Sequence, residues 1–357
     1  MSFVASAGCV PFVPFVVAVF SAAFVSFVTC AAQANAQVYE SVGIRAQGMA
    51  GAFVAVADDA DAAWWNPAGL AGGSYFNAII EYGTSQEPRA ATDPSGLPFT
   101  SWRSGARAFT VAFPALALSY YRLTVSEIQP SGATGAAAAD RQDRGSAPVL
   151  LTSLLLQQFG ATFGQSVGEH FVVGSTVTID RGSFASAVTS AAAATLDRAG
   201  DLEANSQTAV DFDVGALATF GGFRIGAAIK HMTEPTIGIG DQKTTLNRQA
   251  RLGLSMRTPA SGGAGRRIVI AADADLTRTR TAVGDARHLA AGGEVWLENG
   301  LLGVRGGGAV NTVGDLRPSA SGGVSLALRR GTFVDAQVTG GSDQALKSWG
   351  VALRVAY

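Results

Sequence analysis

Apolar and polar side chains alternate along most of the chain beyond residue 73. In the segment 223–230 the odd positions are apolar and the even positions are small or charged, and the segments 251–257, 268–276 and 348–357 repeat this period of two. Neighbouring side chains of a β-strand point to opposite faces, so the period predicts strands with one apolar and one polar face. The apolar faces carry Phe223, Ile225, Ile229, Leu252, Leu254 and Val351.

Fourteen segments read as strands of this kind. Most have about 10–13 residues, which exceeds the ~5–6 of soluble strands and approaches the ~9–11 needed to cross a bilayer at a tilt. An even number of antiparallel strands can close into an up-and-down barrel. The segments are 74–83, 106–113, 115–124, 150–164, 169–181, 207–220, 222–235, 246–258, 266–277, 286–298, 301–310, 317–329, 332–341 and 346–357.

The connections between these segments alternate between short turns and long polar loops. Short turns are expected at Pro114, Gly221-Gly222, Asn299-Gly300 and Arg330-Gly331, and long loops at 84–105, 125–149 and 182–206. Outer-membrane barrels show this asymmetry, with short periplasmic turns and long outer loops. In lipid an open sheet edge would leave backbone groups without partners, so the sheet has to close. The sequence therefore predicts an all-β fold, a 14-stranded antiparallel transmembrane β-barrel over residues 74–357.

Composition agrees with a membrane protein and argues against several other functions. Charged residues make up 15% of the 357 residues, against roughly 25% in an average soluble domain. The net charge of -1 offers no basic surface to nucleic acid. The three histidines, His170, His231 and His288, fall on separate expected strands without metal-ligand spacing, and no nucleophile elbow or phosphate loop occurs. We therefore expect no enzyme activity, no catalytic residue, no cofactor and no metal.

The N-terminus predicts export. Residues 9–32 carry no charge, and two overlapping Ala-x-Ala sites follow within 32–36, so residues 1–36 read as a cleaved secretory signal peptide. A retained membrane anchor is the alternative, because the apolar run is long enough to span a bilayer. Both cysteines, Cys9 and Cys30, lie in this segment. We expect a cysteine-free mature chain in the outer membrane.

The next segment, residues 37–73, is rich in small residues and weakly helical, and we expect it to form a hatch, or plug, inside the barrel. A barrel of this width is not filled by the side chains of its own wall. The stretch from Gly43 to Leu70, with Asn66-Pro67-Ala68 near its end, resembles the N-terminal signature of the FadL-like superfamily of outer-membrane barrels, and especially its PorV-type and uncharacterised branches. The resemblance implies a fourteen-stranded barrel with an N-terminal hatch.

The same resemblance implies two functions. A FadL-like channel passes small hydrophobic molecules across the outer membrane, whereas a PorV-like barrel is a partner in protein secretion or envelope assembly. The partners expected are outer-membrane lipid and lipopolysaccharide, a hydrophobic small-molecule solute, the barrel assembly machinery and, for the alternative, an envelope or secretion protein. No nucleic acid is expected among them.

Several plug residues carry these expectations. Asn66, Pro67 and Ala68 match the family's hatch motif and are expected either to gate a path or only to turn the chain into the first strand. The aromatic residues Phe53, Trp64 and Trp65 are candidate ligand contacts or plug packing. Asp58, Asp59 and Asp61 do not have the spacing of an EF-hand. We expect lumen charges to hold the plug through Arg45 and these three carboxylates.

Charged residues in the strands are expected to point into the lumen. Positions whose numbers sum to 599 face each other if Asn299-Gly300 is a two-residue hairpin turn, so Glu294 and Arg305 are expected to form a cross-strand ion pair. Small inward residues such as Ala228 are expected to tolerate an arginine. Trp349 and Tyr357 lie on one face of the last strand and resemble the C-terminal signal by which the assembly machinery recognises such barrels. The remaining inward charges are Glu81, Asp180, Asp211, Asp213, Arg224, Lys230, Arg251, Arg257, Asp273, Asp275 and Arg354.

Overall fold

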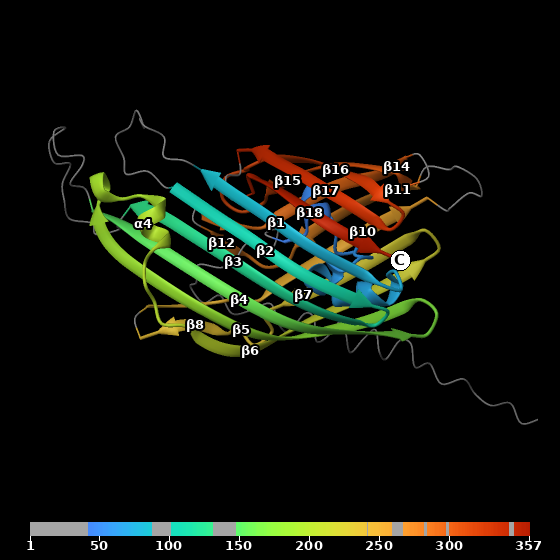
Figure 1. Cartoon of the computed structure of the whole chain (residues 1–357), viewed down its shortest axis with the longest axis horizontal. Helices are drawn as coiled ribbons and strands as arrows, with labels where there is room; N and C mark the ends of the chain where they lie inside the picture. Colours follow the sequence, from blue (N-terminus) through green and yellow to red (C-terminus); the bar gives the residue numbers. More distant parts are fainter. Residues whose placement is uncertain are drawn as a thin grey trace, which may run out of the picture. The chain divides into compact units, whose positions relative to one another are not determined.

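The computed structural model describes most of the chain beyond the expected signal peptide (Figure 1). The predicted signal peptide 1–36, with both cysteines, lies outside the described residues. Among the helices in this part of the chain, none is both long enough and apolar enough to cross a membrane. The described ranges are 42–87, 101–130, 148–240, 242–258, 267–281, 284–297, 300–342 and 346–357.

Antiparallel strands close into a barrel, in which β1 pairs with both β2 and the last strand, β18. Within the described ranges the wall has fourteen strands, and each overlaps one of the fourteen segments expected from the alternation, so the predicted fold class is confirmed. In wall order they are β1 (Asn77–Glu87), β2 (Ser101–Phe113), β3 (Leu116–Pro130), β4 (Pro148–Val167), β5 (Phe171–Ser190), β6 (Gln207–Phe220), β7 (Phe223–Lys230), β10 (Gln249–Arg257), β11 (Arg267–Asp275), β14 (His288–Leu297), β15 (Leu302–Asn311), β16 (Ser319–Arg329), β17 (Thr332–Gly341) and β18 (Ser348–Ala356).

The strands extend into segments that the sequence predicted as loops. The β2–β3 ladder continues until Ser101 faces Ile128, and the β3–β4 ladder until Pro130 faces Val149. These extensions mix buried apolar residues such as Trp102 and Ile128 with polar ones such as Arg103 and Glu127, without the strict alternation of the apolar belt. The pattern of residues therefore did not reveal them, and backbone pairing continues the strands.

Small elements occupy the same end of the barrel as the long connections. Two short hairpins follow wall strands: β8 (Thr236–Ile239) with β9 (Gln242–Thr245), and β12 (Thr279–Thr281) with β13 (Gly284–Ala286). The connection after β5 holds a 3-10 turn, η4 (Ala191–Ala193), and a one-turn helix, α4 (Leu196–Gly200). The predicted loop 182–206 is therefore partly strand and partly helical.

The two faces of the wall differ as the alternation predicts. Large apolar side chains are exposed on the outer face, including Phe223, Leu254 and Val351, whereas Ile229 is half-buried. Charged side chains of the inner face are mostly buried. An exposed apolar belt of this kind is stable only in contact with lipid or another apolar phase.

Residues 42–73, which we call the plug, lie inside the closed wall and are almost entirely buried. They contain α2 (Ile44–Gly48), α3 (Ala62–Trp65) and the 3-10 helix η2 (Pro67–Gly72). The plug backbone lies directly against wall glycines: a Cβ at Gly226 would be 2.7 Å from the carbonyl oxygen of Val54, and one at Gly215 would clash with the side chain of Asn66. Glycine at these positions therefore admits the plug backbone to the wall.

Candidate functional site

Asn66 joins the plug to the wall through its side chain. Its Nδ2 donates to the carbonyl oxygens of Val54 in the plug (2.9 Å) and Ala216 in β6 (3.1 Å). Its Oδ1 accepts from the backbone N–H of Ala68 (3.2 Å) and so caps the N-terminus of η2. Pro67 is the first residue of η2, a position whose N–H has no partner within a helix, so the missing N–H of proline costs nothing there. Both polar ends of the Asn66 amide are thus used, and Asn66 is fully buried.

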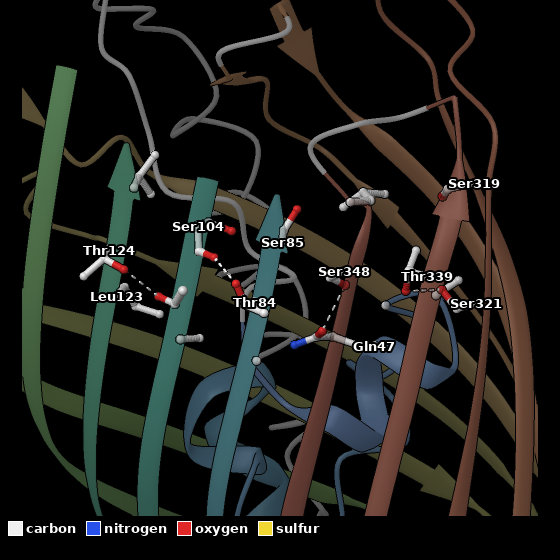
Figure 2. A pocket seen from close by; sticks show the side chains of 17 residues that line it. Gln47, Thr84, Ser85, Ser104, Leu123, Thr124, Ser319, Ser321, Thr339 and Ser348 are labelled. Carbon is white, nitrogen blue, oxygen red and sulfur yellow. Dashed lines mark hydrogen bonds between the residues drawn. The ribbon is translucent and has the colours of Figure 1, made fainter. Parts of the chain in front are cut away.

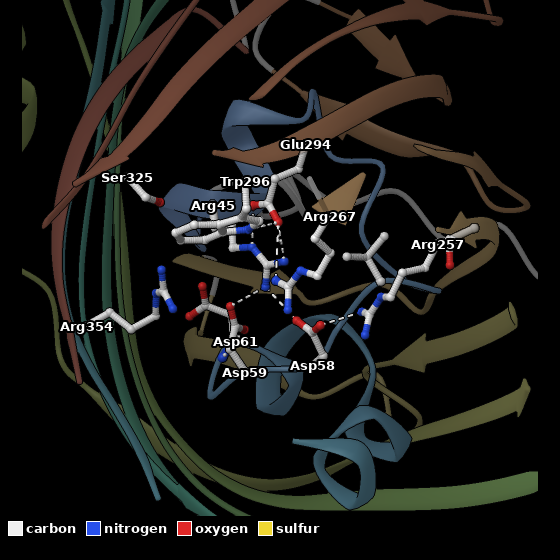
Figure 3. A network of polar contacts seen from close by, with 12 residues as sticks. Arg45, Asp58, Asp59, Asp61, Arg257, Arg267, Glu294, Trp296, Ser325 and Arg354 are labelled. Carbon is white, nitrogen blue, oxygen red and sulfur yellow. Dashed lines mark hydrogen bonds and ion pairs between the residues drawn. The ribbon is translucent and has the colours of Figure 1, made fainter. Parts of the chain in front are cut away.

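Arg45 is the centre of a buried ion-pair network between plug and wall (Figure 3). Its Nε and Nη2 donate to the two carboxylate oxygens of Glu294 in β14, each at 2.7 Å. Its Nη1 donates to Asp58 (2.6 Å) and Asp59 (2.9 Å) within the plug. Arg257 of β10 donates to the second oxygen of Asp58 at 2.5 Å. Two-point contact with a carboxylate is among the stronger polar contacts that a guanidinium makes.

The network continues along the wall through Asp335 of β17. Its carboxylate accepts from Arg354 of β18 at 2.9 Å and from Arg305 of β15 at 3.2 Å. The structure places Glu294 directly opposite Arg305, with Oε2 and Nε 3.7 Å apart. Arg45, and not Arg305, is the closer partner of Glu294. The expected cross-strand pair of Glu294 and Arg305 is therefore one contact within a larger ion-pair network.

The plug carboxylates differ in their electrostatic state. Burial alone raises the pKa of Asp58, but the guanidinium groups of Arg45 and Arg257 outweigh it and hold that pKa well below its usual range. Burial raises the pKa of Asp61 well above its usual range, and the neighbouring carboxylates of Glu81 and Asp59 raise it further. Asp61 has no ion-pair partner among the residues described, so it does not hold the plug as the sequence suggested.

Wall carboxylates also bind the backbone of the plug. Glu81 of β1 accepts from the N–H groups of Gly43 (2.8 Å) and Ile44 (3.1 Å) at the start of α2. One oxygen of Asp273 in β11 accepts from the N–H groups of Phe53 (2.9 Å) and Val54 (2.8 Å). These bonds satisfy backbone donors that no helix of the plug satisfies, and they fix its position in the lumen.

Two cavities contact the plug at opposite ends of the strands. One, of about 440 Å³, lies at the short-turn end and includes Arg45, Asp58, Arg267 and Arg354 in its lining. The other, of about 50 Å³, lies towards the long connections (Figure 2). Its plug side is Gln47, Ala50 and Gly51. Its wall side is rich in hydroxyl groups, from Thr84, Ser85, Ser104, Thr124, Ser319, Ser321, Thr339 and Ser348.

The candidate ligand contacts Phe53, Trp64 and Trp65 line neither of these cavities. All three are buried in the plug, where Phe53 packs edge-on against Trp65 and Trp64 against Tyr121 of β3. Lys230 of β7 lies 3.3 Å from the Trp64 ring centre. Their surroundings match plug packing, and contact with a ligand stays a prediction.

The sequence and the fold were compared with those of known proteins. A family model described as "F plasmid transfer operon, TraF, protein" matches residues 103–275, slightly under half of the chain. No curated protein gives a significant match. Among solved structures, the toluene transporter TbuX of Ralstonia pickettii is similar with a TM-score of 0.58, 13% identity and coverage of 89% of this chain and 99% of that chain.

Two further structures have the same architecture. A Pseudomonas aeruginosa FadL homologue gives a TM-score of 0.55 at 13% identity, covering 90% of this chain and 98% of that chain. The Pseudomonas putida toluene transporter TodX gives 0.52 at 9% identity, again with 90% and 98% coverage. The chain has the fold of the FadL-like outer-membrane barrels.

In this FadL-like barrel, the two residues expected to form an assembly signal lie on the outer face. Trp349 is 51% exposed and Tyr357 is 63% exposed. Trp349 packs against Tyr82 of β1, with ring centres 5.9 Å apart. An aromatic pair at the seam between the first and last strands is accessible to a binding partner, but recognition by the assembly machinery stays a prediction, as does the likeness to PorV-type barrels.

Sequence reasoning missed two members of the ion-pair network, Asp335 and Arg267, whose Nη2 lies 3.9 Å from Oε1 of Glu294. Asp335 was not among the inward charges, although the alternation of Val334, Ala336 and Val338 with Asp335 and Gln337 carries the required signal. The partners of Glu81 and Asp273 could not be found from the sequence, because they are backbone groups of a segment with irregular structure.

Proposed function

We propose that the chain is an outer-membrane channel for small hydrophobic molecules, closed by its plug. The observation that carries the proposal is the closed barrel with an apolar outer belt and a plug that contributes to the lining of a cavity at each end. The likeness of fold to two toluene transporters supports the substrate class. Outer-membrane location follows from the same features.

In this proposal a solute enters at the hydroxyl-lined cavity beside Gln47 and must pass the plug to leave. The described plug fills the lumen with buried side chains, so passage requires that part of it moves. The region around α3 and η2 is the best candidate, because the single side chain of Asn66 bonds two plug segments and the wall there. Two wall bonds to α3, from Thr176 and Lys230, are long, at 3.4 Å each. The ion pairs of Arg45 would then hold the rest of the plug in place.

The test is flux through an Asn66→Ala variant. Loss of three hydrogen bonds frees η2 from Val54 and from β6, whereas the ladder bonds of the wall are unchanged. We expect an altered rate of uptake of a radiolabelled monoaromatic hydrocarbon by cells, and an altered rate of liposome swelling with small solutes. A chain lacking residues 37–64 should give the largest change.

Asn311→Ala is the matched control. Asn311 is also fully buried, and its Nδ2 donates to the carbonyl oxygens of Asp285 (3.2 Å) and Asp315 (3.1 Å), away from the plug. It should lose comparable stability without a change in flux. If removal of 37–64 leaves both uptake and conductance at the wild-type level, the plug does not gate and the proposal fails.

A second candidate is a partner role in the cell envelope. The match of residues 103–275 to the family described as a plasmid transfer protein favours it. Crosslinking in intact cells distinguishes the two functions: a stable protein partner with unchanged hydrocarbon uptake in a deletion strain supports the envelope role. Under either function the chain is not expected to be an enzyme.

A further inference from the structure

Three adjacent wall strands bring together a set of residues that the plug does not use. Asp180 lies on β5, Asp211 on β6, and His231 directly follows β7. One ligand-type atom from each of the three lies within 4.8 Å of the others. All three side chains are at most 1% exposed. The wall pairing explains the approach, because Asp180 faces Ala209 and Asp211 faces Thr178, which makes the two carboxylates diagonal neighbours on the inner face.

Several polar atoms of this cluster have no hydrogen-bond partner in the described part of the chain. They include both carboxylate oxygens of Asp180 and Nε2 of His231. The amide Nε2 of Gln158, which faces Asp180 across β4 and β5, is likewise without one. A buried carboxylate with no donor is costly, so an ion, a proton or a turn of the facing Gln158 amide has to compensate it.

The remaining bonds of the cluster hold the imidazole in place. His231 Nδ1 and Asp211 Oδ2 are 2.8 Å apart. The other oxygen of Asp211 accepts from the N–H of Thr233 (3.0 Å) and from its hydroxyl (2.7 Å). A histidine fixed by a carboxylate on one nitrogen, with the other nitrogen unpaired, is a frequent arrangement at metal sites.

The charge balance of the cluster also favours a bound cation. Asp213 is neutralised by Lys230, with Nζ and Oδ2 3.4 Å apart, and its other oxygen accepts from the N–H of His231. With a neutral imidazole, Asp180 and Asp211 then leave two negative charges in a buried volume. One divalent cation compensates both.

We propose that Asp180 and Nε2 of His231 bind one divalent transition-metal cation such as Zn²⁺, while Asp211 holds the imidazole through its other nitrogen. Mixed carboxylate and imidazole ligands suit Zn²⁺ better than Ca²⁺ or Mg²⁺, which prefer oxygen ligands. Bonds of ~2.1 Å hold ligands roughly 3.4–4.2 Å apart. The ligand-type atoms lie within 4.8 Å of one another, so they have to approach by at most roughly 0.6–1.4 Å. The site does not depend on the transport role, and Lys230 connects it to the plug by donating to the carbonyl oxygen of Trp64 (3.4 Å).

Metal content of the purified full chain tests the proposal. The protein is taken from outer membranes with a tag that contains no histidine, treated with a chelator, and titrated with Zn²⁺ in detergent. Elemental analysis counts the bound metal, and Co²⁺ replaces Zn²⁺ for visible absorption spectra. We expect one equivalent per chain and a rise in unfolding temperature with Zn²⁺.

The decisive variants are Asp180→Asn and His231→Asn. Asparagine suits position 231 because the backbone φ there is +57°, a region that Asn tolerates. Each should bind Zn²⁺ at least 10-fold more weakly and lose the Co²⁺ spectrum, while Asp211→Asn should weaken binding by roughly 10–100-fold. His288→Gln is the matched control, since His288 is also buried and lies 3.7 Å from Asp275.

Heat-modifiable migration on gels shows whether each variant still forms a barrel. Wild-type protein that binds no more Zn²⁺ than the Asp180→Asn and His231→Asn proteins overturns the proposal. The same holds if the His288→Gln protein loses as much metal as the His231→Asn protein. A wild-type cluster that is instead compensated by protons would show no Zn²⁺-dependent rise in unfolding temperature.

Discussion

The two ends of the lumen treat the plug differently. At the short-turn end, Arg45 makes four hydrogen bonds to carboxylates of 2.6–2.9 Å. At the other end, Oε1 of Gln47 accepts hydrogen bonds from Nε2 of Gln337 (2.6 Å) and from the hydroxyl of Ser348 (3.5 Å). A cavity lies at each end, but one end is held by buried charges and the other by neutral groups. Strength of attachment therefore falls along the lumen, and we expect the plug to loosen more easily at the hydroxyl side.

The largest effect is expected from breaking the charged end. Arg45→Met leaves Asp58, Asp59 and Glu294 without their central partner, which should cost about 3–5 kcal/mol of unfolding free energy. Arg103→Met is the matched control, because its ion pair with Asp197 is exposed (36% and 80%) and should contribute at most about 1 kcal/mol. Urea unfolding in detergent measures both. Equal losses in the two proteins would contradict the charged-end account.

The second-largest loss of unfolding free energy is expected from a charge placed on the lipid-facing side of the wall, compared with the same charge at the hydroxyl end. Leu254→Arg places a charge on the outer face of β10 and should cost roughly 2–4 kcal/mol near the bilayer midplane. Ser104→Arg places the same charge beside the hydroxyl-lined cavity, where the side chain can reach water, so its cost should be far smaller. Unfolding in lipid vesicles compares them. The alternation of faces is wrong if Ser104→Arg is the more damaging change.

A pH series separates two plug carboxylates. The pKa of Asp58 is lowered, so its stabilisation is present above about pH 4 and is lost as the pH falls through its folded pKa. The pKa of Asp61 is raised, so its contribution is present below about pH 4 and is lost as the pH rises through its folded value. Asp58→Asn should lower the unfolding temperature at pH 7. Asp61→Asn should raise it at pH 8 and leave it unchanged at pH 3. Parallel responses of the two variants would refute this assignment.

The smallest effect is expected at the hydroxyl end. Ser348→Ala removes two long hydrogen bonds beside a cavity, one to Gln47 (3.5 Å) and one from Gln337 (3.3 Å), so unfolding free energy should change by less than about 1 kcal/mol. The measurement is the same urea titration, with Arg45→Met as the reference for a strong contact. A loss above about 2 kcal/mol would show that the two ends do not differ as described.

The sequence predicted the wall well because a period of two fixes both the strand and its inward face. That pattern predicted the outward position of Leu254, and the expected hairpin turn at Asn299-Gly300 placed Glu294 opposite Arg305. It could not say what fills the lumen. Ala228 faces inward as expected, but it is 2% exposed in the apolar cluster that includes plug residues, so the expected tolerance of an arginine there is wrong. Partners of the plug depend on contacts between residues some 200 positions apart, which no local pattern records.

The glycines that face the plug have a consequence for the order of assembly. The plug comes first along the chain, yet Ile44 packs against Gly350 of β18 and Arg45 binds Glu294 of β14. The N-terminal segment therefore cannot complete its contacts until the C-terminal strands arrive. Complete docking of the plug therefore requires a wall that already includes β14 and β18, and a barrel without these strands lacks these contacts with its plug.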